Sequence, residues 1–402
     1  MPSDSAYWLI AAPHRRGDDQ DLFRSIKSLV GDNVVVGGLE IPDLKTGTLS
    51  SLLNLSDALP KYDSYFTQTV SKLLDTIRSL VSDDKQKMRS YATVNDQPAD
   101  RYMIPSPGSS QGWKWDRSRW GSGGKVLEVI EALNKEMASI DTIQKQKLQN
   151  YNYIKGNLTS AQRKRTGNLS TRSLVGVVKK EDIVLDSEYL ETLIVAVPNA
   201  KKLRVSQLDL SSIGSSSLPS ANPFRKIASD SEFTLQTVTI FKKVKDEYIH
   251  KCRENKQVLI ETLTAFHARD FTWDETAAEK QKQDLADLEA EEKELWSDLL
   301  RLSRTNFSEA YQLLVHLKAV RVFVESVLRY GLPAEYSGVV VKPDAKSSLK
   351  TLKSLSGYFT FLTTKEKKGS GSGDGDVGGE FGAIMDQEYY DFVLFEVPEV
   401  PV

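Results

Sequence analysis

The 402-residue chain is close to neutral, with 53 Lys and Arg against 55 Asp and Glu. This balance argues against a nucleic-acid binder that works by bulk charge. The length allows two to three domains, and the single cysteine, Cys252, excludes a disulfide framework and a Cys-based metal cage. No stretch approaches the roughly 20 apolar residues of a membrane helix, and the N-terminus has no basic segment before its short apolar run. We therefore expect a cytoplasmic protein without direct membrane insertion.

The N-terminal region predicts a mixture of strand and helix. Residues 7–12 (YWLIAA) read as a buried strand, and residues 38–53 as a short extended piece, a Gly turn and a helix start. Apolar residues at helical spacing predict a helix over 62–81. Residues 82–124 are rich in turn-forming residues.

Two heptad repeats dominate the middle of the chain. Apolar positions alternate spacings of four and three from Val126 to Ala161, with a polar interruption at Gln144 and Lys147, and the second repeat runs from Ala278 to Leu302. Such spacing is typical of coiled-coil seams. About 36 residues in the first repeat correspond to a rod of roughly 54 Å.

The two repeats carry opposite charge. Residues 125–165 hold eight Lys/Arg and four Asp/Glu, whereas residues 278–300 hold three Lys and eight Asp/Glu. Like charges across a seam disfavour self-pairing, so the sequence favours pairing of the two repeats within one chain. Two such helices must then run antiparallel.

The residues between the repeats, near 166–262, predict a small α/β domain. TLIVAVP (192–198) and FTLQTVTIF (233–241) read as strands, because they are rich in β-branched residues. We expect a helical or turn-like segment at 179–191 and a solvated loop at 211–222.

The C-terminal region predicts a return to the first domain. A helix over His316–Tyr330 precedes a strand at 338–342, a short helix near 346–355 and a strand at 389–398. We expect this last strand to pair with residues 7–12. The Gly-rich segment 363–382 predicts a linker.

Together these elements predict an α+β fold shaped as an elongated dumbbell. Both termini build one foot domain, and a long antiparallel helical neck joins it to the head. The limits that we assign are foot 1–124, ascending neck helix 125–165, head 166–262, descending neck helix 263–305, and foot again 306–402.

No catalytic motif stands out. Gly124–Lys125 fails as a phosphate loop, because Val126 follows where Ser or Thr is needed. No two histidines share i,i+4 spacing. We expect no enzyme activity, no cofactor and no metal. The scattered histidines are His14, His250, His267 and His316.

Two short segments allow two interpretations each. WKWDRSRW (113–120) could stack on nucleic-acid bases, or Trp113 and Trp115 could anchor a strand of the foot, which we favour because no wider basic field surrounds them. RKRTGNLSTR (163–172) could be a nuclear address. We favour a charged helix end followed by a Gly turn into the head.

The stretch HLKAVRVFVESVLRYGLP (316–333) is apolar almost all round, with Gly331 placed as a C-cap and Pro333 as a stop. The favoured interpretation is a core helix with one solvent-exposed edge. The alternative is that this charged edge is a docking surface for another protein. Buried charges without a partner are costly, so these side chains need exposure or a partner. The charged residues at i,i+3 and i,i+4 spacing are Lys318, Arg321, Glu325 and Arg329.

Four long stretches, spread over nearly the whole chain, resemble the C subunit of the vacuolar-type proton-translocating ATPase (V-type ATPase), in a form like that of fungi. The resemblance is weakest at 82–124, 211–222 and 363–382. The stretches that carry it are IPDLKTGTLSSLLNLSDALPKYD (41–63), AQRKRTGNLSTRSL (161–174), VKKEDIVLDSEYLETLIVAVP (178–198) and HLKAVRVFVESVLRYGLPAEY (316–336).

The resemblance implies a non-catalytic stator component of the ATP-hydrolysing sector, one that leaves when the pump's two sectors separate reversibly. It implies that the head binds a peripheral stalk made of the E and G subunits. It implies that the foot meets another such stalk and the N-terminal domain of the membrane-bound a subunit. The family includes members that bind actin. The resemblance also implies that the chain is attached, through the pump, to the cytosolic face of vacuolar and endosomal membranes.

Reversible release calls for polar interfaces of modest strength. The competing interpretation is a coiled-coil cytoskeletal adaptor that binds actin through the neck, independently of any pump. The candidate interface residues are Arg163, Lys164, Arg165, Lys318, Arg321, Glu325 and Arg329.

Overall fold

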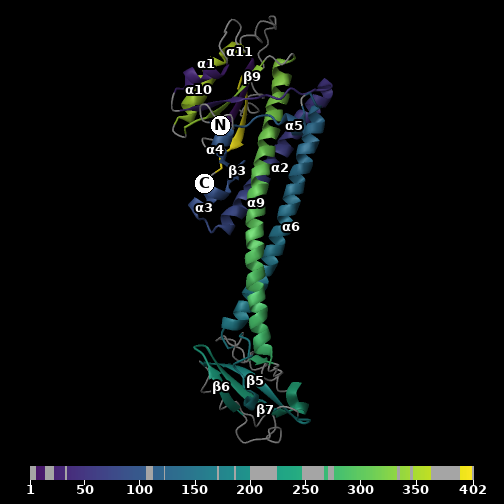
Figure 1. Cartoon of the computed structure of the whole chain (residues 1–402), viewed down its shortest axis with the longest axis vertical. Coiled ribbons are helices and arrows are strands. Elements are labelled where there is room, and N and C mark those ends of the chain that lie inside the picture. The colour runs from purple at the N-terminus through teal and green to yellow at the C-terminus, as the bar shows by residue number, and fades with distance from the viewer. Residues whose placement is uncertain are drawn as a thin grey trace, which may run out of the picture. The chain divides into compact units, whose positions relative to one another are not determined.

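The computed structural model forms two compact units, which are described separately. The first unit comprises Met1–Leu148 and Ser297–Val402, and the second comprises Gln149–Trp296. Helices α6 (Val126–Thr166) and α9 (Ala277–Tyr330) contribute to both units (Figure 1). The structure describes residues 6–13, 22–31, 34–105, 112–121, 123–169, 172–184, 187–199, 224–246, 267–269, 276–332, 336–344, 347–363 and 390–400.

A four-stranded antiparallel sheet joins both ends of the chain in the first unit. Its order is β10 (Val393–Pro398), β1 (Ala6–Pro13), β9 (Tyr336–Lys342) and β2 (Val35–Leu39). Pairing of β1 with β10, with Tyr7 opposite Val397, confirms the expected contact between the terminal strands. Residues 6–12 are buried on both faces of β1, which explains their continuous apolar run.

Helices cover both faces of this sheet. Helices α1 (Leu22–Val30), α10 (Ser348–Tyr358) and α11 (Thr360–Thr363) pack on one face, around Trp8 and Ile10. The C-terminal part of α9 contacts the sheet as well. There the Tyr330 hydroxyl donates to the Ala11 carbonyl at 3.4 Å, and the Arg321 guanidinium lies 4.3 Å from the Phe395 ring centroid.

Helix α2 (Leu49–Leu80) begins where its sequence provides a cap. Gly47 adopts φ +74°, and the Thr48 side chain accepts a hydrogen bond from the Ser51 N–H at 3.2 Å. The predicted Gly turn and helix start are therefore confirmed.

The segment expected to be turn-rich also contains short elements. They are α3 (Lys85–Tyr91), β3 (Thr93–Val94), β4 (Gln97–Pro98), α4 (Ala99–Met103) and α5 (Arg117–Trp120).

Helices α6 and α9 pair antiparallel within each unit, as expected. In the first unit the Gln144 amide donates to the Ser303 hydroxyl at 2.7 Å and accepts from the Asn306 amide at 2.9 Å. In the second unit the Tyr151 hydroxyl donates to Glu292 at 2.9 Å. Of the predicted polar interruption, Gln144 is buried and Lys147 is exposed.

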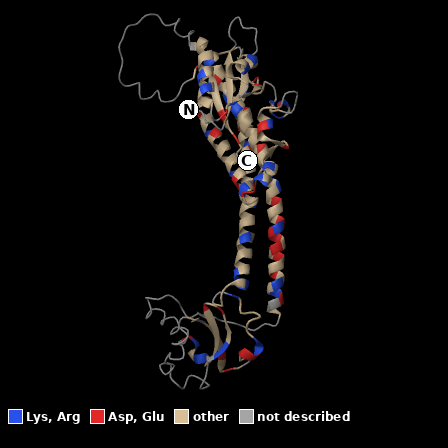
Figure 2. Ribbon diagram, turned by 90° about the vertical axis from the view of Figure 1, so that its left-hand side faces the viewer, with Lys and Arg blue, Asp and Glu red and all other residues tan. Residues whose placement is uncertain are grey.

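The opposite charges of the two helices do not meet across the seam in the second unit. Among the residues that the structure describes there, no ion pair joins residues 149–166 to residues 277–296. Several acidic residues of this part of α9 are exposed instead, including Asp284, Asp287 and Glu291. Figure 2 shows the positions of Asp and Glu along the helix. The seam is therefore held by burial and by neutral or single-charge hydrogen bonds.

Helix α9 corrects one expectation. The sequence suggested a separate helix over His316–Tyr330, but α9 is continuous from Ala277 to Tyr330. The limit that we assign between neck and foot after residue 305 stays a prediction. No Gly or Pro interrupts this span, so nothing breaks the helix when its apolar pattern changes. It ends as predicted at Gly331, at φ +82°, whose N–H donates to the Val327 carbonyl at 2.9 Å. Pro333 lies outside the described residues.

The second unit contains a four-stranded antiparallel sheet. Its order is β6 (Phe224–Ser229), β7 (Phe233–Phe241), β5 (Leu190–Pro198) and β8 (His267–Arg269). Strands β5 and β7 confirm the two predicted strands. The predicted turn-like segment contains the 3₁₀ turn Lys180–Asp182. Buried apolar residues of β5 and β7 pack with residues from the segment before the sheet. This hydrophobic cluster consists of Leu169, Leu174, Val178, Ile194, Ala196, Phe233 and Leu235.

The fold thus mixes long helices with antiparallel sheets, as expected, and the dumbbell arrangement stays a prediction. Several expectations fall outside the described residues. They concern Cys252, the loop 211–222 and all but the first residue of the Gly-rich segment 363–382.

Candidate interaction sites

The charged stripe of α9 finds its first partner inside the chain. Lys318 is only 7% exposed, and its Nζ lies 2.8 Å from a carboxylate oxygen of Asp63 on α2. Arg321 pairs with the same carboxylate. Burial lowers the pKa of Lys318, and the nearby Asp63 charge opposes that shift. The expectation that this edge faces solvent is therefore wrong for Lys318.

The C-terminal residues of the charged stripe, Glu325 and Arg329, also form contacts within the first unit. Glu325 and Arg329 form the predicted i,i+4 pair at 2.6 Å, and Arg329 donates to the carbonyl of Tyr390 at 2.8 Å. These contacts tie α9 to the segment before β10. They favour the interpretation of residues 316–330 as a core helix.

Asp63 was not identified from the sequence, although a signal was present. It lies between Leu59 and Phe66 on the apolar stripe of α2, at i,i+4 and i,i+3 spacing, and all three side chains are buried. An acid on the buried face of one helix and a lysine on the buried face of another indicate an internal ion pair.

The basic C-terminal end of α6 belongs to the second unit and is differently placed. Arg163, Lys164 and Arg165 are all exposed, and none forms an ion pair with a described residue. Their backbone is nevertheless fixed, because the Gly167 N–H donates to the Arg163 carbonyl at 2.8 Å. This end of the helix presents three cations on an ordered turn.

The aromatic segment 113–120 is not a strand, which corrects the favoured interpretation. Residues 113–116 are irregular and lead into α5. Trp113, Trp115 and Trp120 surround His316 of α9, with ring centroids 5.5, 5.2 and 6.2 Å from the imidazole. All four side chains are buried. Nothing local in the sequence joins two segments that lie so far apart along the chain.

His316 is held in one neutral form. Its Nδ1 lies 2.7 Å from the Gln312 carbonyl and therefore carries the proton, while Nε2 accepts from the Asp116 N–H at 3.3 Å. Burial, the largest cause, lowers the pKa of His316, and the positive charge of Arg119 lowers it further. The neutral imidazole thus lies at the centre of the aromatic cluster and contacts all three indole rings.

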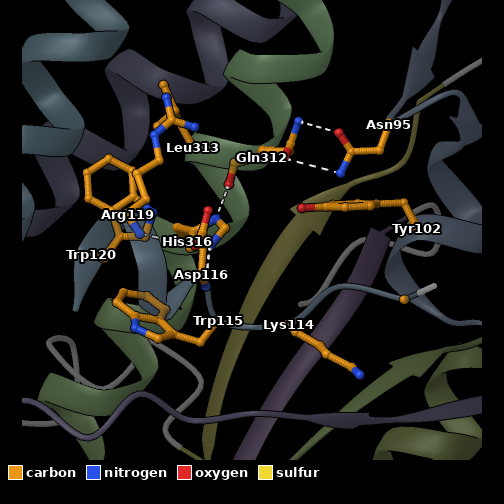
Figure 3. Close-up of a pocket in the computed structure, with 11 residues that line it drawn as sticks. Asn95, Tyr102, Lys114, Trp115, Asp116, Arg119, Trp120, Gln312, Leu313 and His316 are labelled. Carbon is orange, nitrogen blue, oxygen red and sulfur yellow. Dashed lines mark hydrogen bonds between the residues drawn. The ribbon is translucent and has the colours of Figure 1, made fainter. Parts of the chain in front are cut away.

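A cavity of about 270 Å³ opens beside this cluster (Figure 3). Its walls include Trp115, Asp116, Trp120 and His316 on one side and Tyr102 on the other. At its upper edge the carboxamides of Asn95 and Gln312 bond to each other at 2.9 and 3.3 Å. The cavity is therefore bounded by aromatic rings and polar groups from three separate segments.

The described residues contain no group of three His, Cys, Asp or Glu side chains placed to hold a metal ion. In that same part of the chain, no helix is both long and apolar enough to cross a membrane.

Comparison with known proteins extends over the whole chain. The family model of the V-ATPase C subunit matches residues 7–393. The chain is 32% identical over 393 residues to the V-type proton ATPase C 1-A subunit of Danio rerio, covering 97% of each chain. It is 33% identical over 394 residues to the V-type proton ATPase C subunit of Caenorhabditis briggsae, covering 97% of this chain and 96% of that relative.

A solved structure of the cytoplasmic N-terminal domain of the V-ATPase I subunit, a homolog of the a subunit, aligns over 83% of this chain and 92% of its own. The identity is 13% and the TM-score is 0.27. The family match over residues 7–393 and the relatives at 32–33% identity show that the chain belongs to the V-ATPase C-subunit family.

Proposed function

We propose that the chain is the non-catalytic C subunit of a V-type proton ATPase and acts as a stator. In this role it bridges peripheral stalks made of the E and G subunits and the N-terminal domain of the membrane-bound a subunit. It leaves the pump when the sectors separate, and it resides at the cytosolic face of vacuolar and endosomal membranes. The observation that carries the proposal is similarity over 97% of the chain and 97% of a relative that is named as a C subunit.

The helices have the mechanical properties that a stator needs. Helix α6 has 41 residues and α9 has 54, which correspond to about 60 Å and about 80 Å. Their antiparallel pairing contains the buried Gln144–Ser303–Asn306 layer. A buried polar layer penalises sliding of one helix along the other, because a shifted register leaves polar groups unpaired. Such a pair resists torque better than a single helix.

The exposed cations at the end of α6 are the best candidates for a reversible contact. Arg163, Lys164 and Arg165 can pair with carboxylates on a partner without first breaking an ion pair with a described residue. Polar interfaces of this kind suit an assembly that must separate. Lys318, Arg321, Glu325 and Arg329 rank below them, because their charged groups are already paired inside the first unit.

The test is calorimetry of the full chain with the purified E–G stalk. We expect saturable one-to-one binding. Reversal of Arg163, Lys164 and Arg165 to Glu should weaken it about tenfold or more, because each position changes from attraction to repulsion. The matched control reverses Lys85, Lys87 and Arg89 of α3, three exposed cations of the first unit. Absence of binding by the wild-type chain would contradict the stalk-bridging role.

An actin-binding adaptor independent of the pump is the competing function, and neither the similarity nor any described contact favours it. The same protein should therefore show stalk binding without co-sedimentation with actin filaments. Co-sedimentation with actin filaments without stalk binding would favour the actin-binding adaptor over the C-subunit role.

A further inference from the structure

We propose that the cavity beside His316 binds a single guanidinium group, presented by an arginine side chain of a partner polypeptide. All the side chains of this cavity belong to the first unit, and binding there does not depend on the chain's role in a pump. Neither the similarity to other proteins nor the sequence motifs assign a ligand to this cavity.

The size of the cavity fits one side chain. Its volume of about 270 Å³ lies below the roughly 300–1,000 Å³ of sites that enclose whole small molecules. It is also far larger than the space of one water molecule. An arginine side chain inserted from a partner surface is an occupant of the right scale.

Tyr102 supplies an unused polar group aimed into the cavity. The residue is only 5% exposed, and its hydroxyl points across the pocket toward His316 and Asp116 (Figure 3). No described residue forms a hydrogen bond with that hydroxyl. Because Tyr102 lines the cavity, a donor that enters the cavity can form a hydrogen bond with this oxygen.

Asp116 offers a second acceptor. Its Oδ1 accepts from the N–H groups of Ser118 and Arg119 at 3.0 and 3.1 Å and thereby caps α5. Its Oδ2 has no partner among the described residues. Guanidinium donates from several N–H groups in one plane, so it can form hydrogen bonds with more than one acceptor of the cavity wall.

The cavity wall contains one carboxylate and two cations, and one of those cations is already paired with carboxylates behind the wall. Arg119 is already shared between the carboxylates of Glu136 and Glu309, and Asp116 adds a third carboxylate. Lys114 at the edge is the other cation, and it is exposed. The negative charges of Glu309 and Asp116 also raise the pKa of Tyr102, after burial. Asp116 is thus the carboxylate of the cavity wall that can pair with a positive ligand.

Aromatic walls select guanidinium over other cations. Trp115, Trp120 and the neutral His316 ring line one side, and planar guanidinium stacks on such faces. The structure already contains one example, because the Arg119 guanidinium lies 5.1 Å from the Trp120 ring centroid. An ammonium ion is more strongly hydrated and gains less from a flat apolar wall.

The test follows the indole N–H signals of the full chain by NMR during titration with N-acetyl-arginine methylamide. The chain has six tryptophans, so the Trp115 signal can be assigned from the Trp115→Phe variant. We expect a saturable shift of the Trp115 signal with a Kd on the order of 1 mM. The neutral isostere N-acetyl-citrulline methylamide should bind at least tenfold more weakly. No shift, or equal shifts with both compounds, would overturn the proposal even if every variant failed to fold.

Two conservative variants locate the ligand. Tyr102→Phe should weaken binding about three- to tenfold, since it removes one hydrogen bond. Asp116→Asn should weaken it about tenfold, since it removes the charge while keeping an oxygen to cap α5. Matched controls are Tyr91→Phe and Asp75→Asn, which lie in the first unit outside the cavity and should leave Kd unchanged. Unchanged affinity in both pocket variants would place the ligand elsewhere.

A final comparison separates the two sources of guanidinium. A blocked peptide Gly-Gly-Arg-Gly-Gly should bind at least as tightly as agmatine, because the cavity opens to the surface and admits a side chain from outside. Tenfold tighter binding of agmatine would contradict a polypeptide source and assign the cavity to a free small molecule.

Discussion

The carboxylate of Asp63 on α2 lies 2.8 Å from the ammonium nitrogen of Lys318 on α9, although 255 residues separate them in the chain. Both residues are buried, and Arg321 shares the same carboxylate. The pair therefore fixes α2 against the part of α9 that lies in the core of the first unit. A charged group of this kind is neutralised inside the fold and is not offered to a partner.

Removing the acid should be costly. Asp63→Asn leaves the Lys318 charge buried without its counter-ion, and we expect a loss of about 3–5 kcal/mol in the free energy of unfolding of the first unit. Urea unfolding followed by near-UV circular dichroism measures this. The control is Asp75→Asn, which breaks an exposed pair with Arg78 and should cost at most about 1 kcal/mol. Equal losses in the two variants would show that Lys318 does not depend on Asp63.

The buried polar layer of the seam gives a second prediction. Gln144→Leu should destabilise the first unit by about 1–3 kcal/mol, because the Ser303 hydroxyl and the Asn306 amide each lose a partner. Adding Ser303→Ala and Asn306→Leu should recover most of this loss, since no polar group is then left unpaired. Thermal unfolding of the single and triple variants compares them. The exposed Gln146→Leu variant is the control, and a triple variant less stable than the single one would contradict the account.

His316 makes the stability of the first unit depend on pH. Its pKa is lowered by burial in the fold and returns to about 6.5 in the unfolded chain. The unfolded chain therefore binds this proton more readily, so stability is full above about pH 6.5 and falls as the pH drops below it. His316→Gln should flatten that fall. The charged groups near the ring, Asp116, Arg119 and Glu309, remain in the variant, so the difference between the two pH profiles isolates the histidine. If the stability of the wild type and of His316→Gln fell equally as the pH drops, His316 would not be the source of the pH dependence.

Two glycines in or next to long helices should respond to alanine with opposite sign. Gly331 ends α9 at φ +82°, where a side chain is strained, and Gly331→Ala should cost about 1 kcal/mol. Gly156 lies inside α6, and a Cβ at this position would meet no atom within 4 Å. Gly156→Ala should therefore stabilise the helix by about 0.5–1 kcal/mol. The melting temperatures of the two variants test this prediction. A shift of the same sign in both would contradict the assignment of Gly331 as the cap of α9.

Local patterns predicted much of this fold. The β-branched runs predicted β5, β7 and β9, the heptads predicted α6 and α9, and two apolar runs at opposite ends of the chain predicted the β1–β10 pair. In each case the signal is contained in a short window and repeats at the period of the element. Strand β6 (FRKIAS) was missed because it carries two cations and only a weak apolar alternation.

The sites depended on long-range contacts and were harder to predict. The stripe on α9 was predicted to need either exposure or a partner. Asp63, the partner of Lys318, lies on a different helix, and its role follows only from the packing of α2. Likewise, His316 and the segment 113–120 were each noted, yet only tertiary structure brings the imidazole among three indole rings. The exposed Arg163, Lys164 and Arg165 were selected from sequence, and their role in binding stays a prediction.

The most direct test of the central claim is ATP-dependent acidification of membrane vesicles from cells depleted of this chain. We expect acidification to be lost on depletion and to return when the purified wild-type chain is added back. The variant with Arg163, Lys164 and Arg165 reversed to Glu should restore it poorly, and the α3 control should restore it fully. Vesicles that acidify at the full rate without the chain would contradict its proposed role as a stator of the proton pump.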